Sequence, residues 1–280
     1  MFKLGFIDYF LDEWHANQYP NWIKEASGGD MAVTHAFGLI DGPGGKLTSA
    51  AWCEKHGVVH CKTIEELIAA CDGLIVLSPD NPEMHLQLCE KPLQSGKPTY
   101  VDKTFSPDLA TAQAIFDIAA QHNTPCYSTS ALRYASEYQG INTAAITALR
   151  SYGPGTLGNY SVHQLEPLCM LMQAAPARVL CLTGDKCVSM LVQFADGRHA
   201  TVSNFEQGSG FKMDICTGQG VTELTIQSDF FKEFIKVLVQ FFRDSKVPVP
   251  HADTLRIMAL REAALRAAQT PGQWVEVPGK

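Results

Sequence analysis

The sequence predicts a two-domain α/β protein, with an N-terminal doubly wound parallel sheet at residues 1–128 and a smaller α+β domain with a largely antiparallel sheet at 129–280. The chain has 280 residues, which exceeds one typical domain of about 100–150 residues. Strand-like and helix-like segments alternate up to about residue 128, the pattern of a parallel sheet covered by helices on both faces. After Ala131 this alternation ends, and longer strand-like runs carry hairpin signals.

The first domain is predicted from short apolar runs separated by helical segments. Gly73–Ser78 is apolar on both faces, as a buried parallel strand should be. Thr63 followed by Glu66 has the spacing of a helix capping box. The expected strands are Lys3–Asp8, Met31–Asp41, Gly73–Ser78, Pro98–Val101 and Thr124–Ser128, and the expected helices run from about Leu11 to Ala26, Leu47–His56, from Thr63, Pro82–Ser95 and Pro107–His122.

The second domain is predicted to open with a helix at Glu137–Leu149 and a turn at Gly153–Gly158. In the strand-like region that follows, Asp196-Gly197 is a hairpin signal, and Gly218–Gly220 interrupts the last run. The expected strands are Arg178–Leu182, Val188–Phe205, Phe211–Ile226 and Trp274–Val277, and the expected closing helices are Phe230–Arg243 and Ala252–Ala268.

Composition limits the class of protein and its partners. Hydrophobic residues make up 46% and charged residues 18%, which is typical of a folded globular chain. The net charge of -7, without a cluster of Lys and Arg, argues against a nucleic-acid partner, and no apolar run approaches the roughly 20 residues of a membrane span. Nine scattered cysteines without a C-x-x-C pair, and a start at Met1–Asp8 without signal-peptide features, predict a cytoplasmic protein with reduced thiols.

Several segments, taken in order, are similar to the motifs of one enzyme family. Ser95–Thr104 (SGKPTYVDKT) is similar to the stretch "aGKhvlvEKP", with Asp102-Lys103-Thr104 in the place of Glu-Lys-Pro. The other matching segments are Ser78-Pro79 with His85, Ser130–Tyr134, Asn159–His163 in the place of D-x-x-x-H, and Val247–Pro250 with the helix after it. This ordered set covers most of the chain and resembles the Gfo/Idh/MocA family of NAD(P)-dependent sugar and polyol dehydrogenases.

The resemblance implies a Rossmann-like first domain that binds NAD or NADP, and a sugar, polyol or related hydroxy compound as substrate. Oxidation of an alcohol needs an acceptor for the hydroxyl proton, the role implied for His163. A lysine can stabilise the developing alkoxide, the role implied for Lys103. Asn159 would orient the His163 ring but cannot stabilise an imidazolium by charge. In the alternative, Lys103 is a solvated surface residue and His163 a hydrogen-bonded core residue.

The remaining candidate residues follow from the same resemblance and from their places at strand ends. Asp41 would bind the adenosine ribose and favours NAD over NADP, unless it is an ordinary loop carboxylate. Arg133 and Tyr134 would contact substrate or support the domain interface, and Trp14 offers a flat surface to a sugar ring. The candidate cofactor-binding residues are Asp8, Tyr9, Asp41, Ser78, Pro79, His85, Asp102 and Lys103, and the candidate substrate-binding residues are Trp14, His15, Arg133, Tyr134 and Tyr160.

The sequence departs from the family at the turn after the first strand. A Rossmann domain carries G-x-G-x-x-G there, so that the backbone can approach the diphosphate, but Asp8–His15 is bulky and acidic. Each carboxylate near a diphosphate costs about 1 kcal/mol or more at short range. NAD therefore binds in an altered way or not at all. Two alternatives follow: a non-redox sugar sensor that has lost dinucleotide binding, or a lyase or isomerase with a tightly held nicotinamide.

Two further expectations concern metal ions and self-association. Asp12 and His15 share one helical face, but two potential ligands do not make a metal site, and polar residues at a helix start are usually caps, so no metal is expected. The second domain is too small to cover both faces of its sheet. We therefore expect a homodimer or homotetramer formed through the C-terminal sheet.

Overall fold

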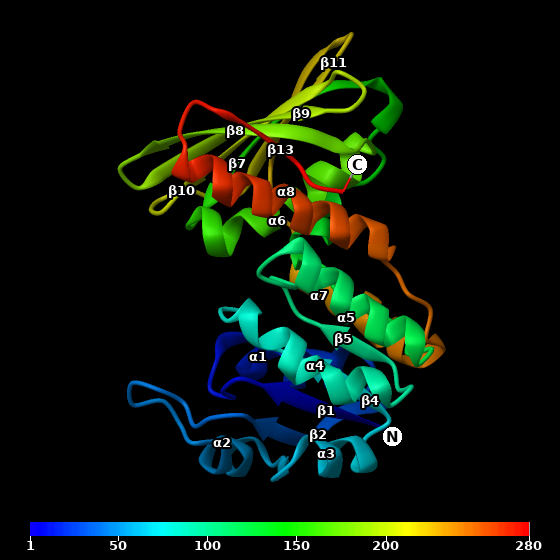
Figure 1. Ribbon diagram of the computed structural model, residues 1–280. Helices are drawn as coiled ribbons and strands as arrows, with labels where there is room; N and C mark the ends of the chain where they lie inside the picture. Colours follow the sequence, from blue (N-terminus) through cyan, green and yellow to red (C-terminus); the bar gives the residue numbers. More distant parts are fainter. Residues whose placement is uncertain (280) are drawn as a thin grey trace. The chain divides into compact units, whose positions relative to one another are not determined.

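The computed structural model describes residues 1–279 and divides them into two compact units (Figure 1). The first unit comprises Met1–Thr129 together with Lys232–His251, and the second comprises Ser130–Phe231 and the chain from Ala252 onward. Within the described residues, no helix has both the length and the apolar character that a membrane crossing requires.

The first unit contains a six-stranded sheet in the order β3-β2-β1-β4-β5-β6, and every neighbouring pair is parallel. The order reverses between β1 and β4, and ligands of such sheets bind outside the carboxyl ends of the strands at this point. The strands are β1 (Phe2–Asp8), β2 (Met31–Gly38), β3 (Val59–His60), β4 (Gly73–Val76), β5 (Thr99–Val101) and β6 (Cys126–Tyr127). The helices are α1 (Trp14–Ala26), α2 (Ser49–His56), α3 (Ile64–Ala70), α4 (His85–Gln94) and α5 (Leu109–Gln121), with a 3-10 turn at Pro82–Met84.

The predicted parallel sheet is confirmed. Only the edge strand β3 was missed, because its two residues are too few to form a pattern. A literal Glu-Lys-Pro sequence also occurs in the chain, but Glu90-Lys91-Pro92 lies inside α4, whereas Lys103 follows the end of β5.

Helix α7 (Phe230–Asp244) completes the core of the first unit although it lies late in the sequence. Its aromatic residues pack on the sheet and on α1. The ring centroids of Phe234 and Tyr100 are 5.5 Å apart, and those of Phe241 and Tyr127 are 4.7 Å apart. Gly73 on β4 leaves room for Phe242, because a Cβ there would lie 2.6 Å from the Phe242 ring. A single boundary at residue 128 was predicted, so the sequence did not predict that residues 232–251 belong to the first unit.

The second unit is built on a seven-stranded sheet in the order β12-β11-β7-β10-β9-β8-β13. The β7–β10 pair is parallel, and the other pairs are antiparallel. The strands are β7 (Ile146–Pro154), β8 (Pro176–Gly184), β9 (Cys187–Phe194), β10 (His199–Phe205), β11 (Lys212–Thr217), β12 (Gly220–Thr225) and β13 (Trp274–Glu276), and the helices are α6 (Leu157–Met172) and α8 (His251–Gln269).

Helices α6 and α8 cover one face of this sheet (Figure 1). Burial along β9 follows this arrangement, because Met190, Val192 and Phe194 are buried while the residues between them are partly exposed. The predicted hairpins are confirmed: Asp196-Gly197 joins β9 to β10, with Gly197 at φ 88°, and Gly218-Gln219 joins β11 to β12.

The helix predicted at Glu137–Leu149 was wrong. The region contains two short 3-10 turns, Ser136–Tyr138 and Thr143–Ala145, and β7 then begins at Ile146. Gly140 between the turns has φ 73°, which a continuous α-helix cannot contain. Pairing with β10 and β11 on both sides draws the following residues into the sheet. The turn predicted at Gly153–Gly158 is shorter in the structure, because β7 extends to Pro154 and α6 begins at Leu157, which leaves two residues between them.

Candidate functional site

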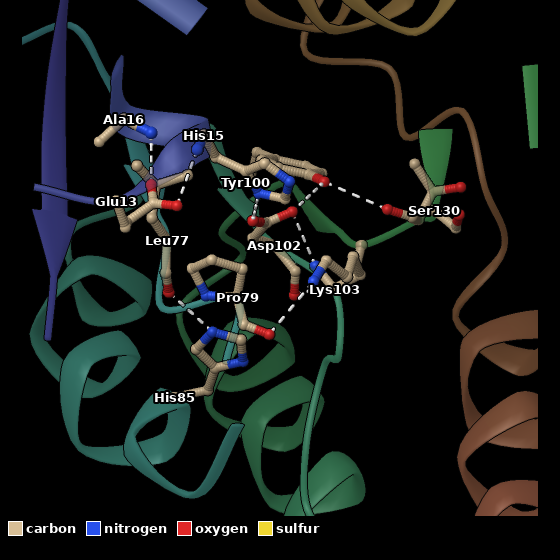
Figure 2. A network of polar contacts seen from close by, with 12 residues as sticks. Glu13, His15, Ala16, Leu77, Pro79, His85, Tyr100, Asp102, Lys103 and Ser130 are labelled. Atoms are coloured by element: carbon tan, nitrogen blue, oxygen red, sulfur yellow. Dashed lines mark hydrogen bonds and ion pairs between the residues drawn. The ribbon is translucent and has the colours of Figure 1, made fainter. Parts of the chain in front are cut away.

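A buried histidine–aspartate pair lies at the carboxyl end of the first sheet (Figure 2). Asp102 immediately follows β5, and His15 lies in the first turn of α1. Oδ2 of Asp102 accepts a hydrogen bond from Nδ1 of His15. Oδ1 accepts from the Tyr100 hydroxyl at 3.1 Å and from the Lys103 amide at 2.8 Å. The exposed fraction is 1% for Asp102 and 7% for His15, so the pair is shielded from water.

Electrostatics fix the protonation of this pair. Burial alone would raise the pKa of Asp102, but His15 and Lys103 outweigh burial and hold that pKa below its usual value. An ionised carboxylate can only accept, so the proton of the His15–Asp102 bond lies on Nδ1. The ring is further fixed by stacking on Tyr19, with centroids 5.0 Å apart and planes at 11°.

Lys103 adds a positive charge beside the pair. Only 7% of the residue is exposed, and its Nζ donates to the Pro79 carbonyl at 3.2 Å (Figure 2). The Lys103–Thr104 peptide bond is cis. Ser78, before Pro79, is buried at φ 89°, and its hydroxyl donates to the Asn81 carbonyl. The structure therefore brings together four predicted site residues from the ends of β4 and β5: Ser78, Pro79, Asp102 and Lys103.

His85 is enclosed in the core. Its Nδ1 is 3.0 Å from the Phe105 carbonyl oxygen, and its Nε2 is 2.7 Å from that of Leu77. Burial lowers its pKa, and none of the residue is exposed. Because both ring nitrogens face backbone carbonyls, His85 joins the end of β4 to the segment after β5, and the geometry does not support a role in cofactor binding.

The turn between β1 and α1 carries two buried acids. Glu13 is the N-cap of α1, and its carboxylate accepts hydrogen bonds from the amides of Ala16 and His15, the latter at 2.7 Å. Burial raises the pKa of Glu13 to about 7, while His15 and the two amides oppose this rise. Asp8 ends β1, is 1% exposed, and has no hydrogen-bond partner at Oδ2. Burial, together with Glu13 and Asp102, raises the pKa of Asp8.

These residues do not fit a dinucleotide bound in the Rossmann manner. Such domains hold the diphosphate on the amides at the start of the helix after the first strand. Here the amides of His15 and Ala16 already bind the Glu13 carboxylate. Asp41, the candidate for the ribose, instead accepts from the Ser49 amide at 2.8 Å at the start of α2. Tyr9 is partly buried, and its ring lies 6.0 Å from that of Phe10.

Asp12 and His15 point to different partners. Asp12 accepts from Asn17 Nδ2 at 3.0 Å and from the Leu47 amide at 2.9 Å, whereas His15 binds Asp102. Among residues 1–279, no group of three or more His, Cys, Asp and Glu residues could hold a metal ion.

Trp14 is 51% exposed, and its ring meets the His15 ring edge-on at 5.2 Å. Trp14 therefore presents an exposed aromatic surface next to the His15–Asp102 pair.

The second unit holds the other candidate histidine on α6, which confirms the helix expected there. Asn159 and His163 lie one turn apart on this helix, and both are half-buried. Nδ1 of His163 is 2.7 Å from the Ser130 hydroxyl oxygen. Tyr160 is 39% exposed, and its ring lies 5.3 Å from the His163 ring.

Arg133 is committed to two carboxylates of the second unit. It lies with Tyr134 in the 3-10 turn Ala131–Tyr134, and Tyr134 is half-buried. The two terminal nitrogens of Arg133 lie 3.0 Å from a carboxylate oxygen of Glu166 and 3.0 Å from one of Asp253. Burial alone would lower the pKa of Arg133, but these two acids outweigh it and raise the pKa. The arrangement supports a structural role for Arg133 rather than contact with substrate.

The pH dependence of stability should report the burial of Glu13. Its ordinary pKa is 4.5, and burial raises it to about 7, so the folded protein binds this proton more tightly than the unfolded chain. The stabilisation is complete below pH 4.5 and is lost as the pH rises through 7. We expect a fall of about 3 kcal/mol in the free energy of unfolding over this range. Urea titrations followed by tryptophan fluorescence would measure it.

Glu13→Gln is the matched control for this pH dependence, because it removes the titrating proton and keeps one acceptor for the amides. The variant should lose most of the fall in stability, and Asp8, whose pKa burial also raises, contributes to the remainder. Equal slopes for the two proteins would contradict the assignment to Glu13.

Comparisons with known proteins identify the fold. No protein-family model and no curated protein matches the sequence. Solved structures match over the full length, including a probable dehydrogenase from Thermotoga maritima (13% identity, TM-score 0.82, 98% of each chain). Myo-inositol 2-dehydrogenase from Lactobacillus plantarum matches at 14% identity and TM-score 0.80, over 99% of each chain. Scyllo-inositol dehydrogenase from Lactobacillus casei, with bound NAD(H) and scyllo-inositol, matches at 16% and 0.79, also over 99% of each chain. The chain therefore has the Gfo/Idh/MocA fold.

Proposed function

We propose that this protein is an enzyme that transfers protons on a small hydroxy or carbonyl compound of the sugar or polyol class, as an isomerase or lyase does. The observation that carries the proposal is the buried bond between Nδ1 of His15 and Asp102, beside the ammonium group of Lys103. The substrate class is supported by the likeness in fold to inositol dehydrogenases. The chemistry is supported by the side chains of the first unit.

Each residue of the group has a separate role in this reaction. Nε2 of His15 takes a proton from the carbon next to a carbonyl group, and Asp102 stabilises the imidazolium that results. Lys103 stabilises the negative charge that develops on the carbonyl oxygen. In an isomerase the proton returns to the former carbonyl carbon, while the proton of the adjacent hydroxyl moves to the former carbonyl oxygen. In a lyase the proton goes to the hydroxyl group on the β-carbon, whose C–O bond breaks to release water. Trp14 offers its exposed ring to the apolar face of a sugar.

Deuterium exchange tests this function whatever the product is. The protein is incubated in heavy water with a panel of ketoses and keto-polyols, and NMR follows the loss of carbon-bound hydrogen. We expect exchange with the wild type and a loss of about 100-fold or more in His15→Gln, since general acid–base catalysis contributes about 10²–10⁴-fold. Asp102→Asn should reduce exchange because it favours the wrong tautomer of His15. Exchange at the wild-type rate in His15→Gln would refute the assignment.

A second candidate function is NAD(P)-dependent oxidation of a sugar or polyol, favoured by the full-length match to a dehydrogenase that holds NAD(H). In that function His163 accepts the hydroxyl proton, Asn159 orients its ring, Lys103 polarises the reacting oxygen, and the dinucleotide binds without the amides of His15 and Ala16. Saturable NADH or NADPH binding by fluorescence, with polyol oxidation and no deuterium exchange, would favour this function. Saturable polyol binding without exchange or oxidation would favour a sugar sensor.

We also propose that the protein forms a dimer or tetramer through the sheet of the second unit. The face of this sheet that α6 and α8 leave uncovered carries partly exposed apolar residues, including Leu180 and Leu191. Light scattering at micromolar concentration should give the mass of two or four chains. Leu191→Lys should shift that mass toward the monomer, and a monomeric wild type would refute the proposal.

A further inference from the structure

The Glu13 carboxylate occupies the place at the start of α1 where a helix otherwise binds an anion. Glu13 has extended backbone, with φ -128°, and its side chain turns back over the first turn of the 13-residue helix. Its two oxygens accept from the amides of His15 and Ala16 (Figure 2). The residue is 5% exposed. Two amide donors and the positive end of the helix dipole are therefore satisfied by a group of the chain itself.

A second acid strengthens this effect. Asp8 lies at the end of β1, at the other end of the same turn, and its buried Oδ2 has no partner. Burial raises the pKa of Asp8, and the nearby charge of Glu13 raises it further. A phosphate brought to this turn would meet occupied donors and nearby carboxyl groups instead of open amides. Both effects oppose its binding.

We propose that the Glu13 side chain is a built-in cap that closes the start of α1 to phosphate-bearing ligands. An anion site for a diphosphate then lies latent beneath the Glu13 side chain. This inference goes beyond the proposed proton transfer, because it concerns which ligands the turn admits, and it does not depend on the chemistry of His15.

Replacement of Glu13 should open the latent site. Glycine and serine are both accepted at an N-cap, so Glu13→Gly and Glu13→Ser should keep α1 while removing the carboxylate. The freed amides can then donate to an anion, and charge-assisted hydrogen bonds are about twice as strong as neutral ones. Glu13→Asp is the matched control, because it keeps a carboxylate at the same cap.

Inorganic pyrophosphate is the direct probe, and its binding can be measured by calorimetry on the full chain, with folding checked by circular dichroism. We expect no saturable binding by the wild type or Glu13→Asp. Glu13→Gly and Glu13→Ser should bind pyrophosphate with an affinity at least about tenfold above the upper limit that the titration sets for the wild type. NADH, titrated in the same way, should follow the same order. Asp8→Asn combined with Glu13→Gly should bind pyrophosphate at least as tightly as Glu13→Gly alone.

Two results would overturn the inference. One is wild-type protein that binds pyrophosphate as tightly as Glu13→Gly. The other is a set of folded Glu13→Gly and Glu13→Ser variants, with and without Asp8→Asn, that all fail to bind it. Neither result bears on deuterium exchange by the wild type, so failure of this inference is distinguishable from failure of the proposed function.

Discussion

Asp102→Ala should destabilise the first unit by about 3 kcal/mol or more, because it removes the shared acceptor of three buried hydrogen-bond donors. The substitution leaves the Tyr100 hydroxyl, the Lys103 amide and the His15 ring without their shared acceptor. Relief of repulsion with Asp8 and Glu13 offsets part of this loss. The midpoint of urea denaturation measures the change.

Tryptophan fluorescence reports this unit well, because three of the four tryptophans, Trp14, Trp22 and Trp52, lie in it. Asp102→Asn keeps the volume and the acceptor of Oδ1, so it should cost less. Lys91→Ala is the second control: it breaks an ion pair with Glu65 in the same unit, but both side chains are more than half exposed, so solvent screens the pair and little stability should be lost. A loss for Asp102→Ala no larger than that for Lys91→Ala would refute the structural role of the pair.

Arg133→Met should destabilise the second unit by about 3–5 kcal/mol. It keeps the apolar volume of the side chain but leaves Glu166 and Asp253 without their common partner, and Glu166 is only 4% exposed. Hydrogen exchange measured by mass spectrometry on peptides from α6 and α8 would detect the loss in this unit specifically. We expect exchange of those peptides to become faster while peptides from β1 and β4 are unaffected.

A compensating change distinguishes the buried charges from simple loss of packing. Adding Glu166→Gln and Asp253→Asn to Arg133→Met removes the two charges that Arg133 had balanced, although Asp253 also pairs with Arg256 at 3.2 Å, and this triple variant should recover a large part of the lost stability. If the triple variant is less stable than Arg133→Met, the penalty does not arise from unpaired charge.

Much of the fold could be predicted because it depends on local patterns. Gly73–Val76 is fully buried, as its continuous apolar run predicted, and the Asp196-Gly197 dipeptide forms its hairpin. The errors lie where distant partners determine the result. Residues from Ile146 onward join a sheet because β10 and β11 pair with them. The apolar face of α7 predicts that this helix is buried, but it does not predict that the helix packs in the first unit.

The candidate site was predicted as separate residues but not as an arrangement. Asp102 and Lys103 could be placed at a strand end from their position after an apolar run. His15 was assigned to substrate, and its bond with Asp102 joins residues 87 positions apart, which no local spacing reveals. Glu13 lies within the acidic segment Asp8–His15, and no capping role was predicted for Glu13 itself. Its place just before the helix was the available signal that it serves as a cap.

The late position of α7 has a consequence for the order in which the protein can fold during synthesis. The first six strands emerge early, but the helix that shields Tyr100 and Tyr127 follows more than 100 residues later. Until it arrives, the nascent N-terminal region exposes an aromatic surface, which attracts chaperones or neighbouring chains. A fragment that stops at Thr129 should therefore be prone to aggregation, and it should become soluble when a peptide spanning 230–251 is supplied in trans.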